Sequence, residues 1–104
     1  MGGLGKNLNE EEIVERIAEA LQVRGLDASA QDTGGAIYCV VLPRKDSGEM
    51  IWGTADFNWG ATVTDDGGDI VSSISTTCPS ESQDIEAIAE VISSHSIQAG
   101  AVTR

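Results

Sequence analysis

The chain has few of the residues on which small enzymes and nucleic-acid-binding domains depend. It holds one histidine, two cysteines, two prolines and 6 basic residues among 104, against 17 acidic residues. A surface that binds nucleic acid directly needs clustered lysine and arginine to neutralise phosphates. A net charge of −11 therefore predicts that this chain does not bind nucleic acid by itself.

The scarcity of cysteine and of long apolar runs bears on compartment. Two cysteines are too few for a disulfide framework, so we expect free thiols and a reducing cytoplasm. The start of the chain has no basic segment followed by an apolar stretch, as a signal peptide would. The longest mainly apolar stretch, 36–42, covers about a third of a membrane span, and we expect no membrane partner. The expected organisation is a flexible leader over 1–8, a single domain over 9–98 and a C-terminal tail over 99–104.

The first strong signal in the chain is helical. Asn9 and Glu12 fit the N-cap and N3 positions of a capping box, and Gly25 fits a helix stop. Between them, apolar residues recur at helical spacing. The pattern predicts a helix over 10–24.

A second amphipathic segment lies near the end of the chain. Ile85, Ile88, Ala89 and Ile92 form one apolar stripe at helical spacing. We expect this helix to follow Cys78-Pro79, to be capped by Ser80 or Ser82, and to end near Ser96.

The middle of the chain alternates β-prone runs with turn signals. The expected strands are 26–31, 36–42, 50–55, 59–64 and 69–77. This order predicts a two-layer α+β domain, an antiparallel meander of four to five strands with both helices on one face. The element order and the acidity look like those of small acidic α+β domains, accessory proteins of mobile elements among them, but no shared motif assigns a role to any residue.

All four aromatic residues lie between positions 38 and 59. A two-residue turn at 55–56 would place Trp52 directly opposite Trp59 on one face of the sheet. Either these side chains fill the core beneath the helices, or they stand on the open face, since Trp and Tyr dominate interface hot spots. We take the anchors of a partner-binding surface to be Trp52, Trp59, Phe57 and Tyr38, with Asp56, Asp65 and Asp66 as flanking charges.

The stretch 36–42 is apolar on both of its faces, which is unusual where one side of an antiparallel sheet faces water. The second face must then be covered by a loop, by another protein or by a second copy of the chain. A homodimer through the open sheet face is one simple solution.

Catalytic signals are weak, and we expect no metal, no cofactor and no enzyme. His95 is the single histidine, at the edge of an apolar stripe near a helix end. The Asp-Gly sequence after Asp65 fits a turn better than a calcium loop. Cys78 is the candidate reactive thiol, because a helix N-terminus lowers a thiol pKa. The sequence Cys78-Pro79-Ser80-Glu81 lacks a resolving cysteine.

These observations favour a small acidic, non-enzymatic module that binds a protein partner, with basic chemistry expected of that partner. The first alternative is an inhibitor of a nucleic-acid enzyme, whose acidic surface imitates a phosphate track. Two further alternatives are a homo-oligomeric structural subunit and a thiol-dependent redox protein that uses Cys78.

Overall fold

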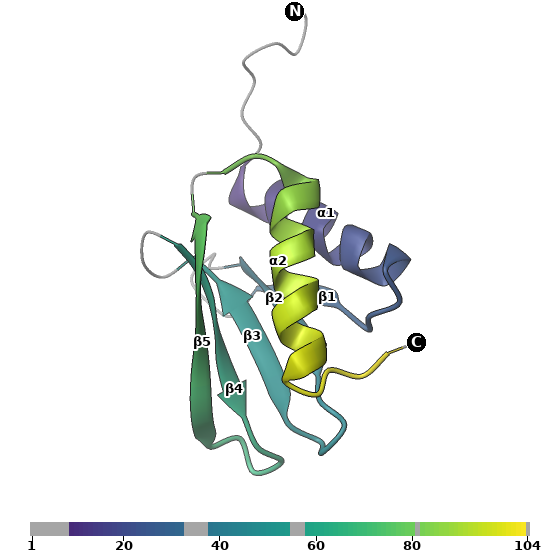
Figure 1. Ribbon diagram of the computed structural model, residues 1–104, viewed down its shortest axis with the longest axis vertical. Helices are drawn as coiled ribbons and strands as arrows, with labels where there is room; N and C mark the ends of the chain where they lie inside the picture. Colours follow the sequence, from purple (N-terminus) through teal and green to yellow (C-terminus); the bar gives the residue numbers. More distant parts are fainter. Residues whose placement is uncertain (1–8, 33–37, 55–57, 81, 104) are drawn as a thin grey trace, which may run out of the picture.

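The computed structural model describes residues 9–32, 38–54, 58–80 and 82–103. The elements are α1 (Glu10–Val23), β1 (Ser29–Asp32), β2 (Tyr38–Pro43), β3 (Glu49–Gly53), β4 (Asn58–Thr64), β5 (Ile70–Pro79) and α2 (Ile85–Gln98). The strands form one antiparallel sheet in chain order, with a helix from each end of the chain packed against it (Figure 1). The predicted α+β meander is confirmed. Within the described residues, neither helix has the length and apolar character needed to cross a membrane.

The capping box that begins α1 is present. The backbone N–H of Glu12 donates to the Asn9 side chain at 2.8 Å, and the Asn9 N–H faces the Glu12 carboxylate at 3.5 Å. Gly25 has a φ of +91°, the left-handed conformation that ends helices and that glycine adopts without strain. The predicted helix is therefore correct at its start, and it ends one residue early, at Val23.

The predicted start of the second helix is wrong. Strand β5 continues through Cys78 to Pro79, and α2 begins only at Ile85. Its N-cap is Asp84, whose carboxylate accepts a hydrogen bond from the Ala87 N–H at 3.2 Å, and neither Ser80 nor Ser82 has this role. Proline lacks the N–H that a strand needs, so Pro79 ends β5 without beginning a helix.

The core lies between the helices and one face of the sheet. Cross-strand pairs place Val40 beside Trp52, and Trp52 beside Ala61, in one row that faces the helices. Ile17 of α1 and Ile88 of α2 are fully buried in the same cluster. The single apolar stripe of each helix is thus covered by one sheet face, and the opposite face receives neither helix.

The chain after α2 returns to the body of the domain. Ala101 forms a bridge with Arg44 and is 2% exposed, and Thr103 forms a bridge with Leu26. Leu26 was expected to open the first strand, but β1 begins at Ser29. Part of the segment expected to be a C-terminal tail therefore packs against the loops at one end of the sheet.

Candidate binding face

Both tryptophans lie in the core, so the prediction that they anchor a partner at the surface is wrong. Trp52 is fully buried and Trp59 is 3% exposed. The Trp52 indole Nε1–H donates to the Ser96 hydroxyl at 3.0 Å, which joins β3 to α2. The core alternative for these two residues is the correct one, because the helices must cover the sheet face that carries the larger apolar side chains.

The pairing of β3 with β4 also differs from the prediction. Trp52 pairs with Ala61, and Gly53 pairs with Gly60, so the two tryptophans are diagonal neighbours on one face. Two of the predicted site residues, Asp56 and Phe57, lie outside the described residues.

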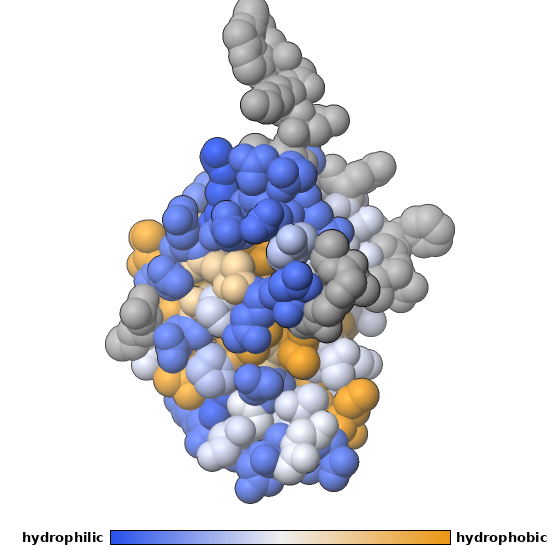
Figure 2. Space-filling model, turned by 180° about the vertical axis from the view of Figure 1, so that it is seen from behind, coloured by the Kyte–Doolittle hydropathy of each residue, from blue (hydrophilic) through white to orange (hydrophobic). Residues whose placement is uncertain are grey.

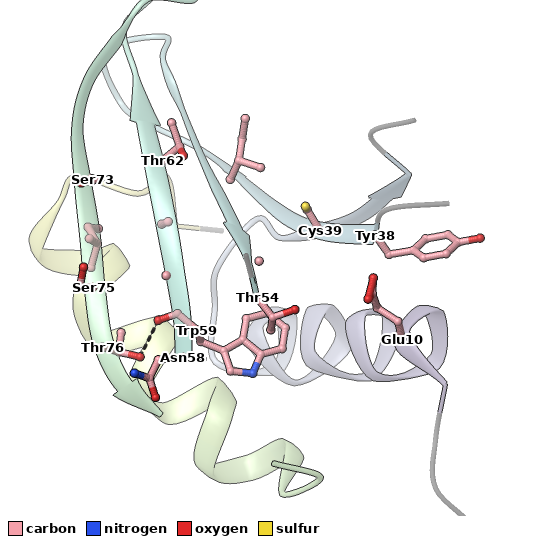
Figure 3. A pocket seen from close by; sticks show the side chains of 15 residues that line it. Glu10, Tyr38, Cys39, Thr54, Asn58, Trp59, Thr62, Ser73, Ser75 and Thr76 are labelled. Atoms are coloured by element: carbon pink, nitrogen blue, oxygen red, sulfur yellow. Dashed lines mark hydrogen bonds between the residues drawn. The ribbon is translucent and has the colours of Figure 1, made fainter. Parts of the chain in front are cut away.

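The face that the helices leave uncovered is hollowed. Next to each core tryptophan a glycine faces the other way, and Gly60 pairs with both Gly53 and Ser75. Cys39 and Thr62 also lie on this face, which carries a hollow of about 610 Å³ (Figure 3). We call this space the open-face hollow. Its lining residues are Glu10, Tyr38, Cys39, Ile51, Gly53, Thr54, Asn58, Trp59, Gly60, Ala61, Thr62, Ser73, Ile74, Ser75 and Thr76.

The floor of the open-face hollow depends on backbone rather than side chains. A Cβ added at Gly60 would lie 2.9 Å from the carbonyl oxygen of Ile74, so only glycine fits without a shift of β5. A Cβ at Gly53 would lie 3.3 Å from the Cys39 sulfur. Larger residues at these two positions would fill the hollow. Because both positions are glycine, the hollow has room for a group from another molecule.

Burial decreases across the hollow from β2 to β5. Cys39 and Val41 are only 8% and 5% exposed although neither α1 nor α2 covers them, which confirms that β2 is buried on both faces. Ser73 and Ser75 on β5 are exposed. Figure 2 shows this side of the molecule, with hydrophobic surface near the middle and hydrophilic surface around much of it. The open sheet face is therefore buried along β2 and exposed along β5.

One end of the open-face hollow is acidic. The hollow reaches the helix side of the sheet at this end. Tyr38 shares the helix-facing side of β2 with Val40, and Glu10, the first residue of α1, lies next to it (Figure 3). The pKa of the Tyr38 phenol is raised above its ordinary 10.0, first by the charge of Glu11, then by burial and by the charges of Asp32, Glu10 and Glu15. This end therefore has a negative potential that favours a cation.

A smaller cavity of about 150 Å³ adjoins this end, and Trp59 lines both spaces. Ile13 and Val14 of α1 form part of its wall. The Trp59 Nε1–H is buried without an acceptor among the described residues. Trp59 is thus a wall between the core and the hollow, rather than the exposed anchor that the sequence suggested.

The two predicted flanking charges that the structure describes, Asp65 and Asp66, do not lie beside the tryptophans. Asp65 and Asp66 lie in the turn between β4 and β5. The Asp65 carboxylate accepts hydrogen bonds from the backbone N–H groups of Gly67 at 2.9 Å and Asp69 at 3.0 Å, so it organises the turn. The length of β4, about 20 Å, separates this turn from Trp59.

The candidate thiol does not have the environment on which its reactivity was argued. Cys78 lies within β5, half-buried, and not at a helix N-terminus. Its pKa is raised by burial and by the charge of Asp84, the opposite of the expected direction.

His95 packs near the Trp52 ring, with the ring centroids 6.3 Å apart. Across the described part of the chain, no three His, Cys, Asp or Glu residues form a group that could hold a metal ion.

A short repeated sequence could have predicted the glycine-lined hollow on this face. Trp52-Gly53-Thr54 and Trp59-Gly60-Ala61 share a Trp-Gly pair. Successive strand residues point to opposite faces, so each pair places a large side chain in the core and a bare backbone on the hollow.

Comparison of the chain with models of protein families, with curated proteins and with solved structures gives no match.

Proposed function

We propose that this chain is a non-enzymatic protein-binding module, which receives an apolar group of a basic partner in the open-face hollow. The observation that carries the proposal is the hollow itself, about 610 Å³ on a sheet face that neither helix covers. The hollow is open along β5 rather than enclosed, which suits a protruding protein surface better than a small molecule that must be buried on most sides.

The chemistry of the partner follows from the two ends of the site. Over Gly53 and Gly60 an apolar or aromatic side chain can approach the backbone closely. At Glu10 and Tyr38 the negative potential favours a lysine or arginine. The net charge of −11 adds long-range attraction, which accelerates the encounter of oppositely charged proteins.

Both cysteines are free thiols, which supports a reducing, cytoplasmic setting.

One observation favours the alternative of an inhibitor that imitates nucleic acid. Glu11, Glu15 and Glu19 are exposed on α1 at intervals of four residues. A helix places such carboxylates in a row about 6 Å apart, a regular track of negative charge. In this alternative the partner contacts α1, and the open-face hollow is not needed.

The test is recovery of a partner from extracts of the source cells, followed by affinity measurements with matched variants. Thr62→Phe fills the hollow with an aromatic side chain, and Val23→Phe adds the same side chain at a site that is 88% exposed on α1. We expect Thr62→Phe to weaken binding by about ten-fold or more, as blocking an anchor site does, and Val23→Phe to change it little. Circular dichroism and thermal melting confirm that each variant is folded.

The outcome also separates the two candidates. Unchanged affinity of a folded Thr62→Phe variant contradicts the hollow as the binding site. If a folded Thr62→Phe variant keeps its affinity while a triple Glu11→Gln, Glu15→Gln, Glu19→Gln variant loses the partner, and DNA competes with the wild-type chain for that partner at low salt, the mimicry alternative holds instead.

A further inference from the structure

Strand β5 is a long outer strand with a free edge. It spans Ile70–Pro79 and, among the described residues, pairs with β4 alone, whereas the other outer strand, β1, has 4 residues and ends in Asp32. Figure 1 shows β5 at the margin of the sheet, beside α2 rather than beneath it. Every second residue of an outer strand directs its N–H and C=O groups away from the sheet, where a further strand can pair with them.

Between its two register shifts, the edge of β5 lacks the usual protection against such pairing. Proteins block outer strands with lysine or other charges, with proline, or with short length. No residue from Ile70 to Cys78 is charged, and the only proline is the last residue, Pro79. Ile70 is 71% and Val71 is 55% exposed. The register shifts lie toward the two ends, so that Ser72 to Ser75 pair regularly with β4 between them.

Carboxylates stand at both ends of this uncharged edge. Asp69 directly precedes Ile70 and is exposed. Asp84 is close enough to Cys78 to raise the pKa of its thiol. An extended segment paired along β5 would therefore meet negative charge at its two ends and none between them.

This distribution of charge distinguishes the two possible occupants. A second copy pairing antiparallel through β5 would bring Asp69 of one copy toward Asp84 of the other, twice, in addition to the repulsion between two chains of net charge −11. A segment with an uncharged centre and basic ends would instead be attracted at both ends.

We infer that the β5 edge docks an extended segment of the basic partner, which adds to the sheet as a further strand with lysine or arginine near each end. The inference rests on the proposed function and names how that partner binds. From Ile70 to Cys78 a strand extends about 27 Å, so the basic residues should stand about nine positions apart. Main-chain hydrogen bonds provide the affinity in this mode of recognition. Ser73 and Ser75 of β5 line the open-face hollow, so the added strand and a side chain in the hollow can belong to one partner.

The test uses a synthetic peptide as the probe. The peptide alternates threonine and valine over about nine residues with lysines at both ends, and a comparison peptide of the same sequence is N-methylated throughout its centre. We expect the N-methylated peptide to bind the full chain about ten-fold more weakly or worse by fluorescence anisotropy, because it cannot donate main-chain hydrogen bonds. Hydrogen exchange should show new protection of backbone amides within 70–78 when the unmodified peptide binds.

Matched variants test the charged ends. Asp69→Asn with Asp84→Asn removes both carboxylates, and asparagine retains the helix cap at position 84. We expect this double variant to bind the peptide several-fold more weakly at low salt. Glu15→Gln with Glu19→Gln removes the same charge from the exposed face of α1 and should have a smaller effect.

Four outcomes would overturn the inference. The first two are binding of the N-methylated peptide as tight as that of the unmodified peptide, and no new amide protection within β5 when the unmodified peptide binds. The third is no binding of the unmodified peptide at about 1 mM and low salt. The fourth is amide protection of β5 that rises with the concentration of the chain without peptide, which would make a second copy the occupant. The Thr62→Phe variant should still bind the peptide. Failure of the peptide therefore counts against the edge alone, whereas failure of the hollow variant to weaken the captured partner counts against the proposed function.

Discussion

At the scale of single residues, Ser96 has a role that its sequence context does not suggest. It is a fully buried serine in a helix, and its hydroxyl accepts the Trp52 indole N–H at 3.0 Å. We expect Ser96→Ala to lower the free energy of unfolding by about 1–3 kcal/mol, because a buried donor would be left without a partner. Urea denaturation measures the effect. Ser94→Ala, at an exposed position of α2, is the control, and equal stability of the two variants would contradict this role.

The single tyrosine allows the acidic end of the hollow to be measured directly. The pKa of Tyr38 is raised from 10.0, with Glu11 the largest cause. We expect absorbance titration of the phenol to give a pKa above that of free tyrosine, and Glu11→Gln or added salt to lower it. Glu19→Gln, which is not among the causes of the shift, should leave it nearly unchanged.

The same shift has a defined consequence for stability. The folded-state pKa of Tyr38 lies above the unfolded-state value, so the unfolded chain releases this proton more readily. Its contribution to stability is complete below about pH 10 and is lost as the pH rises through the folded-state pKa. A Tyr38 that titrates below free tyrosine would contradict the acidic field.

The thiol of Cys78 should be slow to react. Burial and the charge of Asp84 raise its pKa, so little thiolate exists at neutral pH. In a Cys39→Ala background, we expect iodoacetamide to alkylate Cys78 in the folded chain more slowly than in the chain unfolded in urea. Asp84→Asn should accelerate the reaction. Faster alkylation in the folded state would restore the possibility of thiol chemistry.

At the scale of elements, Arg44 joins three parts of the fold. Its guanidinium donates to the carbonyl oxygens of Ala99 at 3.2 Å and Thr64 at 2.9 Å, and it pairs with Asp46 at 3.2 Å. It therefore holds the end of α2 and the end of β4 against the loop after β2. Lysine cannot reproduce this fork of donors.

We expect Arg44→Lys to lower the free energy of unfolding by about 2 kcal/mol, measured by urea denaturation. Arg24→Lys is the matched control, because Arg24 pairs with the exposed carboxylates of Glu86 and Glu90. Exposed ion pairs contribute about 1 kcal/mol or less. Equal losses for the two variants would show that Arg44 does not have this joining role.

Local signals predicted the elements well where they were redundant. The helix over 10–24 had a capping box, an acidic first turn, an apolar stripe and a glycine stop, and α1 begins where they indicate. The start of α2 had competing caps within a few residues. Because β5 stays paired with β4 as far as Pro79, the helix begins only after Asp84, and the earlier serines do not cap it. This strand pairing depends on residues distant in the sequence, which local signals do not reveal.

At the scale of the whole molecule, the excess of 17 acidic over 6 basic residues opposes the compact state. We expect the melting temperature to rise by a few degrees when sodium chloride is increased from about 10 mM to about 0.5 M, because salt screens this repulsion. Differential scanning calorimetry measures the change, and sodium perchlorate at equal ionic strength controls for effects specific to chloride. A melting temperature independent of both salts would mean that the negative charges are too far apart to repel one another.

The sequence by itself determined the order of the elements, the acidic surface and the burial of β2 on both faces, because these follow from composition and from the spacing of neighbours. Alternation along a strand also required Trp52 and Gly53, like Trp59 and Gly60, to face opposite sides. Only the tertiary structure decided which side is inside. The apolar stripes of α1 and α2 pack against the sheet face with the larger apolar area, because this buries the most apolar surface. The tryptophans therefore lie in the core, and the glycines line the hollow on the opposite face.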